Sequence, residues 1–235
     1  MITKLILFSG IAGVTVFIGG ILAHFFNHHI KESPVKYEIT HTLMSFGSGI
    51  ILSALALVLI PKGMEELELL PMSSSFLVGA IVFMLLDRYL SKKGGRIATL
   101  LAMMMDFIPE SIALGAVFAI DIRLATFLAV LIGLQNLPEA FNSYRDLILS
   151  GFTTKKTLII FFFLSFFGIF GALAGHLLLS NHQELTAHLM TFASGGILYL
   201  LIQDIIPEGT LKKNHLTSLG ATLGFLVGII GDQLV

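Results

Sequence analysis

Two short polar segments with the same pattern lie inside long apolar stretches of the chain. In each, a polar residue is followed four positions later by a glutamate that comes directly after a proline. One segment carries Asp106 and Glu110, and the other carries Gln135 and Glu139, with Asn136 beside them. Residues at i and i+4 share a helix face, about 6 Å apart, so we expect the side-chain oxygens of each pair to converge.

Such oxygen atoms inside an apolar helix predict a divalent cation site. An ionisable residue at a helix centre costs about 2.5–3.5 kcal/mol on insertion scales. Pro109 and Pro138 each remove a backbone donor and free a carbonyl one turn earlier, which is tolerated where that carbonyl lines a site. Facing oxygen ligands suit a divalent cation, which would also offset the repulsion between carboxylates. The structural alternative is that the prolines only kink the helices and that a protonated glutamate is hydrogen-bonded.

Further polar residues lie near the ends of other apolar stretches. Asp204 and Glu208 come at the end of one, where they predict either an exit site for the cation or an interfacial helix cap. His24 and His28 share a helix face near the end of another. They are interpreted either as a transient metal-handling pair or as interfacial histidines.

The composition is that of a membrane protein. Of the 235 residues, 55% are hydrophobic and 12% are charged, with a mean hydropathy of +0.92, whereas a soluble domain carries about 25% charged residues. The net charge of -1 gives no indication of nucleic-acid binding. Because the chain has no cysteine, disulfides, thiolate metal sites and cysteine nucleophiles are excluded.

Segments of about 20 apolar residues are long enough to span a bilayer, and charge, proline and glycine divide the chain into eight of them. We therefore predict an all-α integral membrane protein with one transmembrane domain over 1–235, in which the first apolar run is retained rather than cleaved as a signal peptide. The predicted helices cover approximately 4–28, 39–61, 73–90, 97–120, 124–148, 157–180, 185–207 and 215–235.

The basic residues predict the orientation of these helices. Only Lys4, Lys62 and Arg123 fall on one side of the predicted bundle. Basic residues in short loops favour the cytoplasm, so we expect a multi-pass protein of the cell (inner) membrane with both termini outside the cytoplasm. The other eleven of the 14 Lys and Arg lie on the opposite side: Lys31, Lys36, Arg88, Lys92, Lys93, Arg96, Arg145, Lys155, Lys156, Lys212 and Lys213.

Two of the predicted helices are similar in sequence at an offset of 146 residues. Residues 46–63 read FGSGIILSALALVLIPKG, and residues 192–209 read FASGGILYLLIQDIIPEG. The predicted orientation makes the two helices run in opposite directions. The similarity therefore indicates an inverted repeat, which is common in secondary transporters.

The chain resembles the ZIP family of zinc and iron transporters, as a divergent prokaryotic-type member. The resemblance rests on the paired Pro-Glu motifs, on the segment ASGGILYLLIQDIIPEG, and on eight helices whose first and last three form an inverted repeat. It implies a ZIP-type helical bundle, often dimeric, that moves divalent metal cations through a site between the helices at 97–120 and 124–148.

The departures from the family pattern concern the metal ligands. Asp106 stands where the family often has His, Phe107 where it often has Asn, and Gly168 and Ile169 align where it often has an acidic residue followed by Pro. The site therefore loses nitrogen ligands and becomes richer in oxygen. Mn²⁺ or Fe²⁺ is then at least as suitable a substrate as Zn²⁺, and a second metal position is expected to be absent.

Two other functions fit parts of this pattern. One is a non-transporting, ZIP-like protein that senses metal or acts as a scaffold. The other is an intramembrane hydrolase, for which Gly47-Ser48-Gly49 is the nearest motif, but no histidine lies at the middle of a predicted span to act as a base. Metal transport through Asp106, Glu110, Gln135, Asn136 and Glu139 is the function that we predict, with the lipid bilayer and the metal ions as partners.

Overall fold

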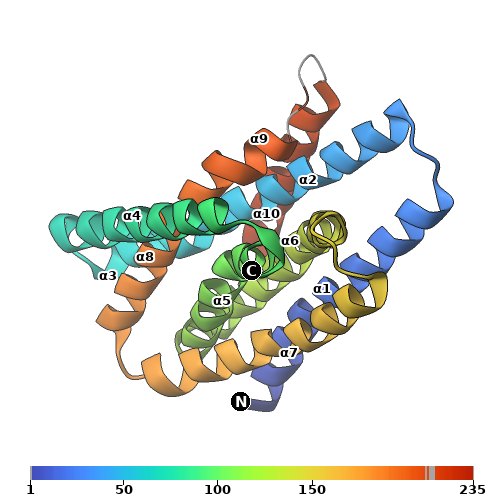
Figure 1. The fold of residues 1–235 in the computed structure, drawn as a ribbon. Coiled ribbons are helices and arrows are strands. Elements are labelled where there is room, and N and C mark those ends of the chain that lie inside the picture. Colours follow the sequence, from blue (N-terminus) through green and yellow to red (C-terminus); the bar gives the residue numbers. More distant parts are fainter. Residues whose placement is uncertain (1, 210, 212–214, 235) are drawn as a thin grey trace.

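The computed structural model describes residues 2–209, 211 and 215–234, and for residues 95–97, 99, 102, 103, 106 and 208 it describes only the backbone. The described chain is helical almost throughout (Figure 1). Its elements are α1 (Ile2–His29), α2 (Pro34–Ala54), η1 (Leu55–Leu59), α3 (Ile60–Glu66), α4 (Leu69–Lys93), α5 (Gly95–Ile120), α6 (Ile122–Leu149), α7 (Thr154–Leu179), α8 (Gln183–Leu200), η2 (Leu201–Ile205), α9 (Ile206–Gly209) and α10 (His215–Leu234).

These helices confirm the predicted all-α membrane class. Within the described residues, seven helices are long and apolar enough to cross a membrane, and α2, η1 and α3 together form one of them, over Pro34–Glu66. In α5 the described apolar stretch is Phe107–Ile120, although the helix itself has 26 residues. The fold therefore has seven or eight spans, depending on whether α5 is counted.

Capping residues make several helices begin before the predicted apolar stretches. The hydroxyl of Ser33 accepts a hydrogen bond from the Lys36 backbone N–H, and Pro34 is the first residue of α2, where its missing N–H has no cost. The carboxylate of Asp121 caps α6 in the same way. Such caps satisfy backbone donors that apolar periodicity does not detect.

The inverted repeat is visible in an unusual backbone feature. The two helices of the repeat each contain one π-helical segment, η1 at Leu55–Leu59 and η2 at Leu201–Ile205, again offset by 146 residues. In each, the N–H of the following isoleucine reaches the carbonyl five residues back. π-Bulges are rare and are common at functional sites, so two at equivalent positions are strong support for a shared origin of the two halves.

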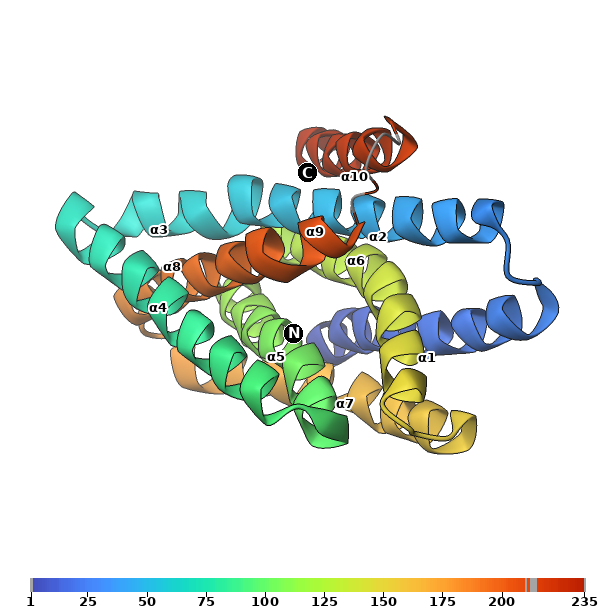
Figure 2. The same ribbon diagram turned by 45° about the horizontal axis from the view of Figure 1, so that its top comes forward.

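The packing of the helices repeats as well. Helix α10 lies alongside α2, and α4 lies alongside α8 (Figure 2). In the repeat, α2 is equivalent to α8 and α4 is equivalent to α10. Replacing each helix by its equivalent therefore turns the α10–α2 pair into the α4–α8 pair. The same exchange converts the α1–α6 pair into α7–α5, and α2–α6 into α8–α5. The inner helices α5 and α6 are thus held by equivalent neighbours on both sides.

Four glycines let the repeated helix pairs approach closely. A side chain at Gly49 would overlap the backbone carbonyl of Ala221 on α10, and one at the equivalent Gly195 would overlap the carbonyl of Phe76 on α4. Gly224 and Gly79 make the reciprocal contacts with the carbonyls of Phe46 and Phe192. Small residues at such positions are the usual means by which membrane helices pack.

We expect Gly49→Ala and Gly195→Ala each to lower the free energy of unfolding by about 1–3 kcal/mol, because a backbone carbonyl cannot move aside cheaply. Gly10→Ala is the matched control, since its new methyl group would meet only Ile169, at 3.5 Å. Thermal unfolding in detergent measures the three variants. Equal stability of Gly195→Ala and Gly10→Ala would contradict the close approach.

Candidate cation site

A buried contact between α5 and α6 joins the two Pro-Glu motifs. The side-chain amide of Gln135 donates hydrogen bonds to both carboxylate oxygens of Glu110, at 2.6 Å each. Glu110 is 3% exposed and Gln135 is fully buried. Both helices continue through their prolines, Pro109 and Pro138. The two motifs that were paired from their sequences are therefore paired in space.

Asn136 and Glu139 lie on the cavity side of this contact. Asn136 is buried, and its amide donates to the backbone carbonyl of Ala12 on α1 at 2.9 Å. That bond fixes the amide plane and leaves its oxygen as the atom that can accept a cation. Glu139 is half-buried and lines the same cavity as Asn136.

This cavity has a volume of about 380 Å³ and is lined by residues from most helices of the bundle. Along α6 its lining runs from Asn136 to Asp146, which corresponds to roughly 15 Å of helix. It ends at the turn between α4 and α5, where Ser91 and Gly94 line it. Nine of the 14 Lys and Arg lie in the α1–α2, α4–α5 and α6–α7 connections or in the helix ends beside them, and we call this side of the bundle the basic end.

Three aspartates line the part of the cavity nearer the basic end. Asp87 accepts hydrogen bonds from Ser91 at 3.1 Å and from Tyr199 at 3.0 Å. Asp146 accepts one from Asn142 at 3.2 Å. The third is Asp204, which lies in the π-helical segment η2. Glu139 and these aspartates give the cavity an acidic lining, which favours cations.

Two of these aspartates, Asp87 and Asp146, were not predicted as site residues from the sequence. Asp146 follows Glu139 by seven residues, with Asn142 between them, so a polar stripe at helical spacing could have revealed it. Asp87 stands beside Arg88 near the end of its helix, and nothing local distinguishes it from an interfacial residue. It joins the cavity only because α4 packs against α8.

Of the other predicted site residues, the structure describes the side chain of Asp204 but not those of Asp106 and Glu208. Asp204 lines the cavity, as an exit site requires, whereas its neighbour Gln203 is exposed on the outside of the bundle. Asp106 and Glu208 belong to α5 and α9, but their side chains lie outside the described part of the structure.

Apolar packing closes the bundle on the far side of the Glu110–Gln135 contact. Leu55 and Leu59 of η1, Leu114 and Phe118 of α5, and Leu131 of α6 are each at most 1% exposed and belong to one core cluster. The contact thus lies between an acidic cavity that leads to the basic end and a dense apolar layer on the other side.

Phe107 and Gly168, two residues that depart from the family pattern, lie next to each other in the structure. Phe107 is 7% exposed and packs in a second apolar cluster with Phe161 and Leu164. Its ring tip lies 3.2 Å from the point where a side chain on Gly168 would begin. The ring therefore occupies the space into which an acidic residue at position 168 would project.

The described side chains form no group of three His, Asp or Glu residues close enough to hold a metal ion. The donors at the α5–α6 contact are two carboxylates together with the amides of Gln135 and Asn136. Of the histidines, His24 is hydrogen-bonded to Tyr144 at 3.0 Å and His188 to Ser75 at 2.7 Å. A metal ion at the α5–α6 contact would accordingly be held by oxygen atoms.

Fold and cavity together define a polytopic membrane protein built on an inverted repeat, with a polar site between its two inner helices. The family model of the ZIP zinc transporters matches residues 92–231, which is more than half of the chain. The chain belongs to the ZIP zinc transporter family, and membership implies transport of divalent metal cations across a membrane. The comparison with curated proteins found no match.

Proposed function

We propose that the protein binds one divalent cation between α5 and α6 through Glu110, Gln135, Asn136 and Glu139, with Asp106 as a further ligand. The cation leaves through the cavity lined by Asp87, Asp146 and Asp204, past Glu208. The observation that carries this proposal is the buried Gln135–Glu110 contact beside an acidic cavity. Two carboxylates and two amides are ligands that suit a hard divalent cation.

The Gln135 amide gives the buried carboxyl group of Glu110 a hydrogen-bond partner within the protein. The Gln135 Nε2 lies 2.6 Å from both carboxyl oxygens of Glu110, so the amide supplies this buried group with a hydrogen-bond donor. The Gln135 side-chain oxygen is buried and has no hydrogen-bond partner among the described residues. Rotation of the amide by about half a turn would withdraw the N–H groups and present this oxygen to an arriving cation.

The contact of Phe107 with Gly168 supports a single cation position. Filling that space with an aromatic ring removes both the room and the ligand that a second cation would need. A site with one cation and mainly oxygen ligands favours Mn²⁺ or Fe²⁺ at least as much as Zn²⁺, because imidazole and thiolate ligands are those that select zinc.

The orientation of the protein in the membrane is part of the same proposal. Basic loops favour the cytoplasm, so the cavity would open toward the cytoplasm of a cell (inner) membrane, with both termini outside. The cation would then leave the site on the cytoplasmic side. We also propose that the protein acts in this way as a carrier and not as an enzyme, either alone or as a homodimer.

Uptake into proteoliposomes tests the proposal. We expect saturable, protein-dependent uptake of Mn²⁺, with Fe²⁺ and Zn²⁺ as competitors and Ca²⁺ as a weak one, since Ca²⁺ takes more ligands than this site offers. Zn²⁺ uptake that Mn²⁺ does not inhibit, together with no uptake of Mn²⁺ itself, would contradict the proposed oxygen site, to which Mn²⁺ is suited.

Binding without flux would favour the second function, a ZIP-like metal sensor or scaffold. Calorimetry on the same preparation distinguishes the two. Tight binding of Mn²⁺ in detergent, together with no uptake in liposomes that seal and retain a control solute, would replace transport by sensing.

A further inference from the structure

A second cavity, of about 450 Å³, lies at the basic end on the other face of α6. It is lined by the end of α1, the start of α2, the end of α6 and the first residue of α7. Arg145 lines this cavity, whereas its neighbour Asp146 lines the acidic one. Two cavities of opposite charge therefore flank one helix, and metal transport makes no use of the second.

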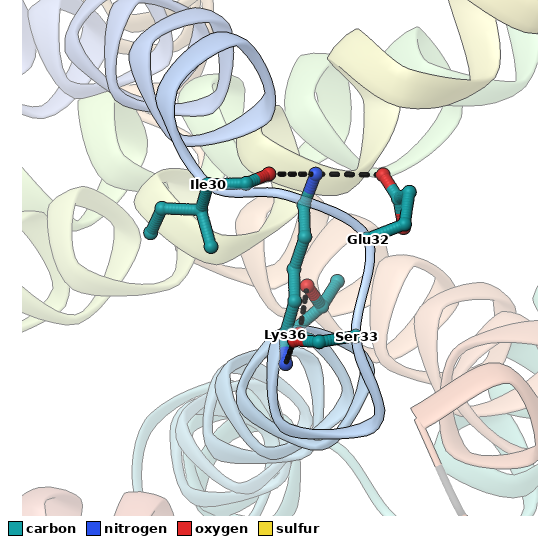
Figure 3. Close-up of polar contacts among 5 residues, drawn as sticks. Ile30, Glu32, Ser33 and Lys36 are labelled. Atoms are coloured by element: carbon teal, nitrogen blue, oxygen red, sulfur yellow. Dashed lines mark hydrogen bonds and ion pairs between the residues drawn. The ribbon is translucent and has the colours of Figure 1, made fainter.

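Two cations face this second cavity from different helices. Lys36 of α2 is buried, and its ammonium group donates to the backbone carbonyl of Ile30 at 3.0 Å and to Glu32 at 2.7 Å (Figure 3). Arg145 of α6 is exposed and makes no hydrogen bond or ion pair with a described residue. Among the described residues of the lining, the only carboxylate is that of Glu32, whose side chain is 89% exposed.

The remaining polar groups of the cavity are mostly donors or neutral. His24 stacks on His28 with 6.0 Å between ring centroids, and it continues through Tyr144 to Thr154 by hydrogen bonds of 3.0 Å. Thr154 begins α7, and Lys36 lies in the first turn of α2, so the positive ends of two helix dipoles point to the same place.

The cavity also has an apolar side. Phe141, Ile148 and Leu149 line it, and Leu149 is 74% exposed. Phe25 and Ile30, on the adjoining part of the chain, are exposed as well, at 54% and 42%. Exposed apolar residues on a membrane protein face the acyl chains of lipids, so the cations lie next to hydrocarbon and not only next to water.

We propose that this cavity binds the headgroup of an anionic phospholipid, with Lys36 and Arg145 on the phosphate and the acyl chains along Leu149 and Phe25. Basic pockets between membrane helices are a recurrent form of lipid headgroup site. The apolar rim favours a lipid over free phosphate, which would gain nothing from Leu149. The proposal is independent of metal transport.

Glu32 acts as a competitor for the same cation. Its carboxylate lines the same cavity and accepts a hydrogen bond from the Lys36 ammonium group at 2.7 Å (Figure 3). The hydrogen bond and charge of Lys36, assisted by the charge of Arg145, lower the pKa of Glu32 below its usual value. Glu32 is therefore ionised at neutral pH, and an arriving phosphate must displace it from Lys36.

Native mass spectrometry of the purified protein with equal amounts of phosphatidylglycerol and phosphatidylcholine tests the proposal. We expect phosphatidylglycerol to be preferred, and Arg145→Gln to lower that preference about fivefold, the value for one basic residue near a lipid surface. Lys155→Gln is the matched control, because Lys155 is exposed nearby on α7 but does not line the cavity. Glu32→Gln should raise the preference.

Three outcomes would overturn the proposal: equal binding of the two lipids by the unmodified protein, equal losses in Arg145→Gln and Lys155→Gln, or displacement of the lipid by millimolar inorganic phosphate. The last would identify a free anion as the ligand. Because the Arg145 side chain is exposed and makes no hydrogen bond with a described residue, its substitution should leave folding intact, which an unchanged thermal unfolding temperature in detergent would verify.

Discussion

Glu139→Gln is expected to reduce Mn²⁺ uptake into proteoliposomes by about 100-fold or more, and Glu110→Gln is expected to do the same. Even outer residues of metal sites typically change affinity by 10–100-fold, and these two carboxylates would be direct ligands. Glutamine keeps the size of the side chain and removes its charge, so the loss would report on the cation rather than on packing. Uptake rates over a range of Mn²⁺ concentrations measure the effect.

Glu184→Gln is the control for this pair. Glu184 is an exposed carboxylate in the first turn of α8, away from the cavity, so its loss should leave uptake within about twofold. Both site variants should remain folded, since a glutamine at position 110 can still accept a hydrogen bond from Gln135. Uptake in Glu139→Gln that equals uptake in Glu184→Gln would remove Glu139 from the site.

The sequence was sufficient to predict the parts of the molecule that depend on local patterns. Charge and apolar length divided the chain into its helices, because both act residue by residue along a span. The repeat was detectable from two segments alone, and the π-helical segments at Leu55–Leu59 and Leu201–Ile205 now support it. The i, i+4 spacing predicted only that Gln135 and Glu139 share one face of their helix, and it did not predict that Gln135 would donate to Glu110 on α5.

What the sequence could not predict depends on which helices become neighbours. Asp87 lines the cavity only because α4 packs on α8, and Arg145 and Asp146, adjacent in the chain, face different cavities. Asp87 and Arg145 cannot be distinguished from interfacial residues when their own segments are considered alone, whereas the helical spacing of Glu139, Asn142 and Asp146 could have indicated Asp146. The contact between Phe107 and Gly168 joins residues 61 positions apart, and no spacing rule connects them.

The contact between Phe107 and Gly168 leads to the second prediction with a large expected effect. Gly168→Glu alone should destabilise the protein severely, because the new carboxylate would be driven against the Phe107 ring in a buried site. Phe107→Asn alone should cost about 3–5 kcal/mol, the usual cost of removing a buried aromatic side chain. In the double variant the smaller amide side chain makes room for the carboxylate, and we expect it to be more stable than the sum of the single changes by about 1–3 kcal/mol.

The double variant should also bind a second cation. The new carboxylate at position 168 and the new amide at position 107 would add two oxygen ligands beside Glu110 and Glu139, and a bound cation would offset the repulsion between the carboxylates. Metal analysis of the purified protein should then give about two Mn²⁺ per chain instead of about one. Phe107→Leu is the control, because it keeps the space apolar and should keep one cation. A double variant that shows neither the extra stability nor the extra cation would mean that Phe107 does not occupy a former ligand position, and the single-cation site would then need another explanation.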